Sequence, residues 1–89
     1  PAAFHRVVTS EIKTGNWVQV NQPVDGCLIL MSAGRLWHHV GMWLDINSGR
    51  VLHSREGIGV SLDNRHSLNS FNRVEFWKYV PVTNSAPSI

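Results

Sequence analysis

His38-His39-Val40-Gly41-Met42-Trp43-Leu44, followed across a polar turn by Val51-Leu52-His53-Ser54, is the stretch that decides the fold. Both runs are rich in branched and aromatic residues, and the residues between them have turn composition, so the stretch predicts an antiparallel hairpin. A three-residue loop at 47–49 would place Gly49 at a positive φ. That register would put His53 on the same face of the hairpin as His39.

Side chains alternate between the two faces of a strand. In the first strand His39, Gly41 and Trp43 share one face, and the other face carries apolar side chains only: Val40, Met42 and Leu44. We expect the second face to be the core face. Gly41 would then leave open space beside His39, where a thiol or a substrate could approach.

The rest of the chain supplies one helix and several more strands. Residues 2–14 carry apolar side chains at helical spacing and predict an amphipathic helix. Further strands are expected at 17–20, 27–31, 60–62 and 73–82, and residues 63–68 are expected to form a helical turn or an ordered loop. Residues 83–89 have the composition of a flexible tail. The sequence therefore predicts one α+β domain over residues 1–82, with a small curved antiparallel sheet or barrel of five to six strands.

Composition excludes several classes of protein. The chain has 89 residues, a hydrophobic fraction of 43% and no long apolar run, which argues against disorder and against a membrane-spanning segment. The formal charge of +2 comes from scattered basic residues, so no nucleic-acid-binding stripe is indicated. Cys27 is the one cysteine, which excludes an internal disulfide and favours a reducing compartment. Pro1 would remain after removal of an initiator Met, but it would also begin a piece cut from a longer polypeptide.

Three segments together resemble the NlpC/P60 cysteine peptidases of the papain-like class, especially those attached to phage tails. The run Pro23-Val24-Asp25-Gly26-Cys27-Leu28-Ile29-Leu30-Met31 is similar to the family's Pro-x-x-Gly-Asp strand. His39-Val40-Gly41-Met42-Trp43-Leu44 is similar to its His-Val-Gly-Ile-Tyr-Leu strand, and Val51-Leu52-His53-Ser54 to the Ile-His-Ala that follows. The resemblance spans residues 15–80. It implies the barrel half of that fold, with His39 as the catalytic base and His53 as the residue that orients it.

The resemblance fails at the nucleophile. In the family a cysteine opens a helix upstream of the Pro-x-x-Gly-Asp strand, and residues 1–26 contain no cysteine. Cys27 stands where the family has the aspartate of that strand, within an apolar run that we expect to be buried. We therefore do not expect Cys27 to be a nucleophile, and we interpret His39 and His53 as the remnant of a catalytic pair.

The family resemblance without its nucleophile implies a structural subunit of a phage or prophage tail tip or hub, made in the bacterial cytoplasm and assembled into the virion tail. Its partners would be other tail proteins, and neither a cofactor nor catalytic activity is implied. One alternative is a peptidase that hydrolyses γ-D-glutamyl-diamino acid linkages in peptidoglycan, through Cys27 or through a cysteine upstream of Pro1. Another alternative is a module that binds the cell wall.

Other interpretations of the histidines and aromatics remain open at this point. His39 and His53 can simply be half-exposed strand residues that bond to each other or to the backbone. A zinc site of His38, His39 and His53 is disfavoured because neighbouring strand residues face opposite ways. The four tryptophans lie on separate segments, which favours packing over a platform for sugars or nucleic acid.

Overall fold

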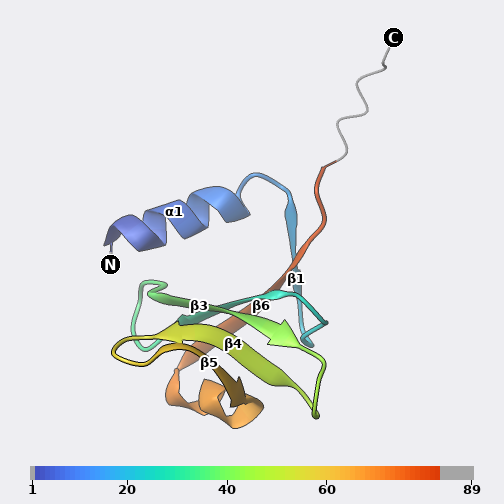
Figure 1. Cartoon of the computed structure of the whole chain (residues 1–89). Helices are drawn as coiled ribbons and strands as arrows, with labels where there is room; N and C mark the ends of the chain where they lie inside the picture. The colour runs from blue at the N-terminus through green and yellow to red at the C-terminus, as the bar shows by residue number, and fades with distance from the viewer. Residues whose placement is uncertain (1, 83–89) are drawn as a thin grey trace.

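The computed structural model describes residues 2–82, and the predicted tail at 83–89 lies outside them. Its elements run in the order α1 (Ala2–Ile12), β1 (Trp17–Val20), β2 (Leu28–Ser32), β3 (His39–Leu44), β4 (Arg50–Arg55), β5 (Gly59–Asn64), the 3-10 helix η1 (Arg65–Ser70) and β6 (Arg73–Tyr79) (Figure 1). The predicted α+β class is confirmed. The predicted helix was two residues too long, and the segment predicted as a turn at 63–68 begins instead with the last two residues of β5.

The six strands form one antiparallel sheet in the order β1-β6-β2-β3-β4-β5. The sheet is curved and unclosed, because β1 and β5 remain at its two edges. Strands β2 to β5 follow one another as neighbours, whereas the final strand β6 inserts between β1 and β2. The sheet is therefore built from local hairpins on one side and from a long-range pairing on the other.

The main core cluster lies on the face of the sheet that carries His39, which contradicts our prediction for β3, although Leu30 on the opposite face is also fully buried. Trp43 is 4% exposed, whereas Met42 on the opposite face is 43% exposed. The central cluster consists of Cys27, Ile29, Met31, Trp43 and Val51, and Leu68, Phe71, Val74 and Phe76 pack against it. Leu68 of η1 and Phe71 just after it cover this face, and both follow β5 in the chain. The alternation of side chains identified the two faces correctly, but it did not reveal which face η1 covers.

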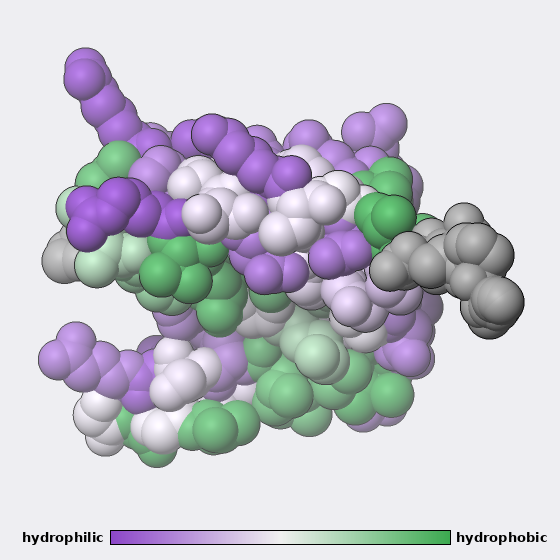
Figure 2. All heavy atoms as spheres, turned by 90° about the horizontal axis from the view of Figure 1, so that it is seen from above, coloured by the Kyte–Doolittle hydropathy of each residue, from purple (hydrophilic) through white to green (hydrophobic). Residues whose placement is uncertain are grey.

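The opposite face carries a row of apolar side chains in register across four strands: Leu28, Met42, Leu52 and Leu62. Met42 and Leu62 are exposed, at 43% and 47%, and Val60 beside them is 75% exposed. A view from above shows apolar residues along the lower side of the picture and in further patches at its left and upper right (Figure 2). We call these four leucine and methionine side chains the apolar row.

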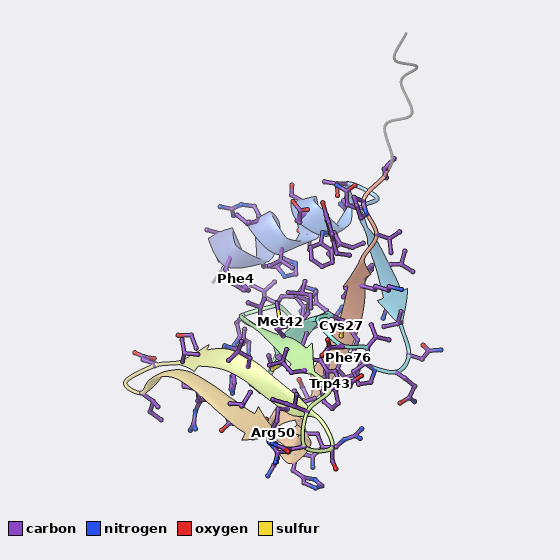
Figure 3. The ribbon with its side chains drawn as sticks, turned by 45° about the vertical axis from the view of Figure 1, so that its right-hand side comes forward. Phe4, Cys27, Met42, Trp43, Arg50 and Phe76 are labelled. Carbon is purple, nitrogen blue, oxygen red and sulfur yellow. The ribbon has the colours of Figure 1, made fainter. Side chains whose placement is uncertain are left out.

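Helix α1 lies over this second face but packs only loosely against it. None of its residues is fully buried, and Val7 is 69% exposed. Phe4 lies on the side of the helix that faces the sheet (Figure 3). Two hydrogen bonds attach the helix: the Trp37 backbone N–H donates to Nδ1 of His5 at 2.9 Å, and Nε1 of Trp17 donates to Glu11 at 3.0 Å. Within residues 2–82, neither helix has the length and apolar character needed to span a bilayer.

Candidate active site

The hairpin of β3 and β4 sets the position of both histidines. Its last pair is Leu44 with Arg50, so the loop has five residues rather than the predicted three. Because the difference is an even number of residues, His53 still lies on the face of His39. The positive φ predicted for Gly49 is confirmed, at 98°. A side chain at this position would also run into the ring of Trp43, because an added Cβ would lie 2.3 Å from it.

Three neighbouring strands contribute one side chain each to a continuous hydrogen-bonded set on the core face. Nε2 of His39 lies 2.7 Å from Nδ1 of His53, and Nε2 of His53 lies 2.6 Å from Oδ2 of Asp63. Ser61 adds a hydrogen bond from its hydroxyl to the same carboxylate oxygen at 3.1 Å. We refer to His39, His53 and Asp63 as the triplet.

The bonding pattern assigns the proton positions in the triplet. Nδ1 and Nε2 of a neutral imidazole are one donor and one acceptor, and an ionised carboxylate only accepts. His53 must therefore donate from Nε2 to Asp63, which leaves its Nδ1 to accept the N–H of His39 Nε2. The lone pair of His39 then resides on Nδ1, which has no hydrogen-bond partner among the described residues. The triplet thus presents one basic nitrogen, on His39.

The electrostatics of the triplet agree with this assignment. The hydrogen bond from His53 is the main cause that lowers the pKa of Asp63, and Ser61 and the nearby Arg55 lower it further. Burial lowers the pKa of His39, and the neighbouring imidazoles of His53 and His38 add to that effect. Asp63 is therefore ionised and His39 neutral near pH 7, which are the states that a general base and its orienting group require.

Packing against Phe71 limits the movement of the His39 ring. The ring of His39 stacks on Phe71 with centroids 5.8 Å apart and an angle of 12° between the planes. The space beside it is not open, contrary to our expectation for Gly41. A Cβ added at Gly41 would lie 3.0 Å from the Leu52 carbonyl oxygen and 3.3 Å from Cβ of His53. Gly41 therefore serves the close approach of His53 and Met31 rather than the entry of a substrate.

Cys27 is placed too far along the sheet to serve His39. The register pairs Met31 with His39, and a backbone hydrogen bond joins Trp43 to Cys27. Four residue steps along β2 correspond to about 13 Å. Cys27 is also only 1% exposed, and burial raises the pKa of its thiol. A buried, protonated thiol at this distance cannot attack a substrate bound at His39.

His38 has no hydrogen bond to the triplet, although its ring lies 5.9 Å from that of Phe71, on which His39 also stacks. Its Nε2 accepts the backbone N–H of Ala33 at 2.8 Å, so this ring is used to close the loop before β3. Among residues 2–82 no group of three or more His, Cys, Asp or Glu side chains could hold a metal ion.

Asp63 is the candidate site residue that our sequence analysis missed. We predicted a helical turn or an ordered loop at 63–68, whereas Asp63 belongs to β5, whose pairing with β4 ends at Arg55 and Gly59. The signal was present in the glycines: Gly57 and Gly59 both have positive φ and form a tight turn. Extending the hairpin argument through that turn would have placed Ser61 opposite His53 and Asp63 diagonal to it.

Comparison of this chain with protein-family models, with curated proteins and with solved structures finds no match. Any assignment of function therefore rests on the geometry of the site and on the sequence resemblance.

Proposed function

We propose that this chain is the base-bearing half of a cysteine hydrolase similar to the NlpC/P60 peptidases. The triplet carries this proposal, because two hydrogen bonds of 2.7 and 2.6 Å leave a single basic nitrogen on His39. Two strand histidines that met by chance would not be expected to be accompanied by a carboxylate that orients one ring directly and the other through it. This support is stronger than the sequence alone provided, and it favours a working base over a remnant.

The chemistry assigned to the triplet is proton transfer. A cysteine thiol would give its proton to Nδ1 of His39 while its sulfur attacks the carbonyl carbon of the scissile amide. The resulting imidazolium would be stabilised through His53 by the negative charge of Asp63. His39 would then return the proton to the leaving amine as the carbon–nitrogen bond breaks, which leaves an acyl-enzyme for water to hydrolyse.

The thiol must come from outside the 89 residues, because Cys27 is the one cysteine in them and it cannot reach His39. A longer form of this chain or a second protein would supply it. From the resemblance to NlpC/P60 we propose that the substrate is the γ-D-glutamyl-diamino acid linkage of peptidoglycan.

The test compares the 89-residue chain with the product translated from its native gene on purified peptidoglycan. Released muropeptides are measured by mass spectrometry. We expect the 89-residue chain to be inactive, and His39→Ala to reduce cleavage by the cysteine-containing form about 10²- to 10⁴-fold. Cys27→Ala is the matched control and should keep full activity. Cleavage that survives His39→Ala, or that Cys27→Ala abolishes, would refute the proposal.

The two exposed side chains of the apolar row, Met42 and Leu62, favour a second candidate function, a structural subunit of a phage tail tip or hub. Leu62 and Val60 belong to β5, an edge strand whose outer backbone groups have no strand partner among the described residues, and Met42 lies two strands away on the same face. Such an edge next to apolar side chains suits docking by a neighbouring subunit. Met42→Ser with Leu62→Ser should prevent incorporation into purified virion tails, as measured by mass spectrometry, whereas Val18→Ser on the distant β1 should not. Normal incorporation of the double variant would exclude this role for the row.

A further inference from the structure

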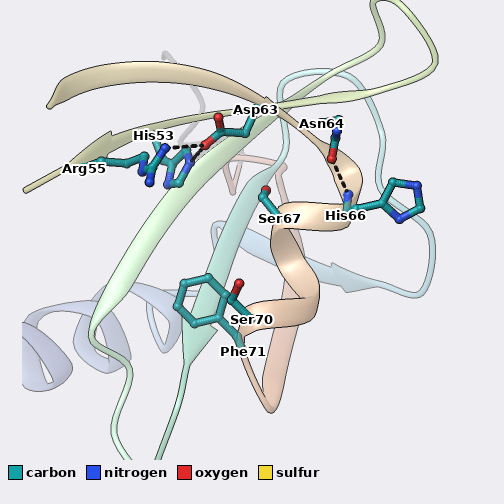
Figure 4. A pocket seen from close by; sticks show the side chains of 8 residues that line it. All are labelled: His53, Arg55, Asp63, Asn64, His66, Ser67, Ser70 and Phe71. Atoms are coloured by element: carbon teal, nitrogen blue, oxygen red, sulfur yellow. Dashed lines mark hydrogen bonds and ion pairs between the residues drawn. The ribbon is translucent and has the colours of Figure 1, made fainter.

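A pocket of about 480 Å³ lies behind the triplet, between the β4–β5 hairpin and the 3-10 helix η1 (Figure 4). Seven of the eight residues that line it are polar or charged, and the eighth is Phe71. The titratable groups that line it are Arg55, His53, Asp63 and His66. The pocket therefore adjoins the Asp63 end of the triplet, away from the nitrogen that acts as the base.

Ser67 is the first group in the pocket with unused hydrogen-bonding capacity. Its hydroxyl oxygen is buried and has no hydrogen-bond partner, and it is the one such side-chain atom in the described part of the chain. Figure 4 shows this hydroxyl pointing from η1 toward the side of the pocket formed by β4 and β5. A buried hydroxyl without a partner destabilises the fold by about 1–3 kcal/mol, so a ligand that accepts its hydrogen bond would be favoured.

Arg55 is the second such group. Its guanidinium lies 3.8 Å from Asp63, at the limit of an ion pair, and the side chain is 47% exposed. A guanidinium has five N–H donors, and one long contact leaves most of them available to a ligand. The carboxylate of Asp63 is already matched by the donors of His53 and Ser61 on one oxygen. Besides the second carboxylate oxygen of Asp63, which accepts no hydrogen bond from the described residues, the unused capacity of the pocket therefore includes the donors of Arg55 and Ser67, with one half-exposed positive charge among them.

We propose that this pocket binds a small oxyanion, a carboxylate or phosphate group, through the guanidinium of Arg55 and the hydroxyl of Ser67, and that the bound anion favours the protonated form of the triplet. The proposal concerns the pocket itself and does not depend on whether the triplet acts in hydrolysis.

Electrostatic linkage gives the second half of the proposal. A negative charge beside His53 and Asp63 stabilises an imidazolium in the triplet and raises the pKa of His39. By reciprocity, protonation of the triplet strengthens anion binding by the same factor. In a working hydrolase the bound anion would therefore inhibit the reaction, because the protonated form of His39 cannot accept a proton.

The test uses the 89-residue chain and two probes, acetate and inorganic phosphate, each compared with chloride at equal ionic strength. Binding is followed by backbone amide NMR shifts, and the protonation of His39 and His53 by the ring signals as pH is varied. We expect saturable shifts at Arg55 and Ser67 with at least one probe. The titration midpoint of the triplet should rise by about one pH unit at saturation, which corresponds to tenfold coupling.

Two variants with matched controls separate this site from weak surface binding. Ser67→Ala removes no existing hydrogen bond, so it should fold normally and weaken binding about fivefold, and Arg55→Gln should weaken it about tenfold. The controls, Ser54→Ala and Arg35→Gln, change exposed residues that do not line the pocket and should bind as the wild type does. Saturable binding that both pocket variants retain would overturn the proposal, and so would the absence of any response to both probes in the wild-type chain.

Discussion

Replacing Gly41 by alanine should disturb the fold and the site together. The added Cβ would lie 3.0 Å from the Leu52 carbonyl oxygen, 3.2 Å from Cε of Met31 and 3.3 Å from Cβ of His53. The end of Met31 can move, but a backbone oxygen within a strand pair cannot move without disturbing the ladder. Overpacking of this kind typically destabilises by about 1–3 kcal/mol. Removing a glycine stiffens the unfolded chain and offsets about 0.4–1 kcal/mol of that. The expected net loss is about 1–2 kcal/mol.

Urea denaturation and thermal melting measure this loss. For a domain of this size about 1 kcal/mol corresponds to a melting temperature shift of about 4–8 °C. Gly34→Ala is the matched control, because its added Cβ has no neighbour within 4 Å and its backbone does not have a positive φ. The control should be neutral or slightly stabilising. The displacement of His53 should also lengthen its bond to His39 and move the pKa of His39 back toward its ordinary value of 6.5, which NMR titration of the ring would show. Equal stability of the two variants would refute the packing that we describe around Gly41.

Two further predictions concern the charges of the site, and a third concerns the buried thiol of Cys27. Asp63→Asn removes the anion that stabilises a protonated triplet, so NMR titration should show the histidine midpoints falling relative to the wild type, whereas Glu56→Gln on the neighbouring turn should leave them unchanged. Stability against urea should fall on acidification, because His39 and Asp63 both have lowered pKa values in the folded protein: the loss should begin as pH falls below about 6.5 for His39 and deepen below about 3.8 for Asp63. A flat profile between pH 7.5 and 5 would contradict the partly buried, neutral state of His39. Alkylation of Cys27 by iodoacetamide should be at least about tenfold slower in the native chain than in urea, because its thiol is buried and its pKa is raised, and equal rates would contradict this placement.

The strands were predictable because their local patterns are strong, and the face of the core was not. Runs of branched and aromatic residues located β2, β3, β4 and β6 to within a few residues. Both faces of β3 are apolar, however, since Trp43 lies on one and Met42 on the other. Which of them is buried depends on where η1 folds back, and this is decided by contacts of Leu68 and Phe71 with distant strands. Local alternation contains no information about such contacts.

The site was predictable only as far as the first hairpin extends. Turn composition between β3 and β4 placed His39 and His53 on one face, and the structure brings their rings to hydrogen-bonding distance. Asp63 was missed because the residues around it are polar and resemble a loop. Its strand character comes from pairing with β4, and its role comes from lying diagonal to His53. When the position of a side chain depends on pairing with a neighbouring strand, the residues around it in the sequence contain little information about that position.

The triplet is built entirely from short-range connections, and this bears on the order in which the protein folds. Its two hydrogen bonds join residues separated by 14 and 10 positions. By contrast, β1 joins the sheet only through β6, at pairs such as Trp17 with Tyr79. Short loops close quickly, and contacts distant in sequence form slowly. We therefore expect the double hairpin from β3 to β5 to form early and β6 to complete the sheet late. The triplet would then be assembled while one edge of the sheet is still unpaired and free to pair with a segment from another part of the chain or from another protein.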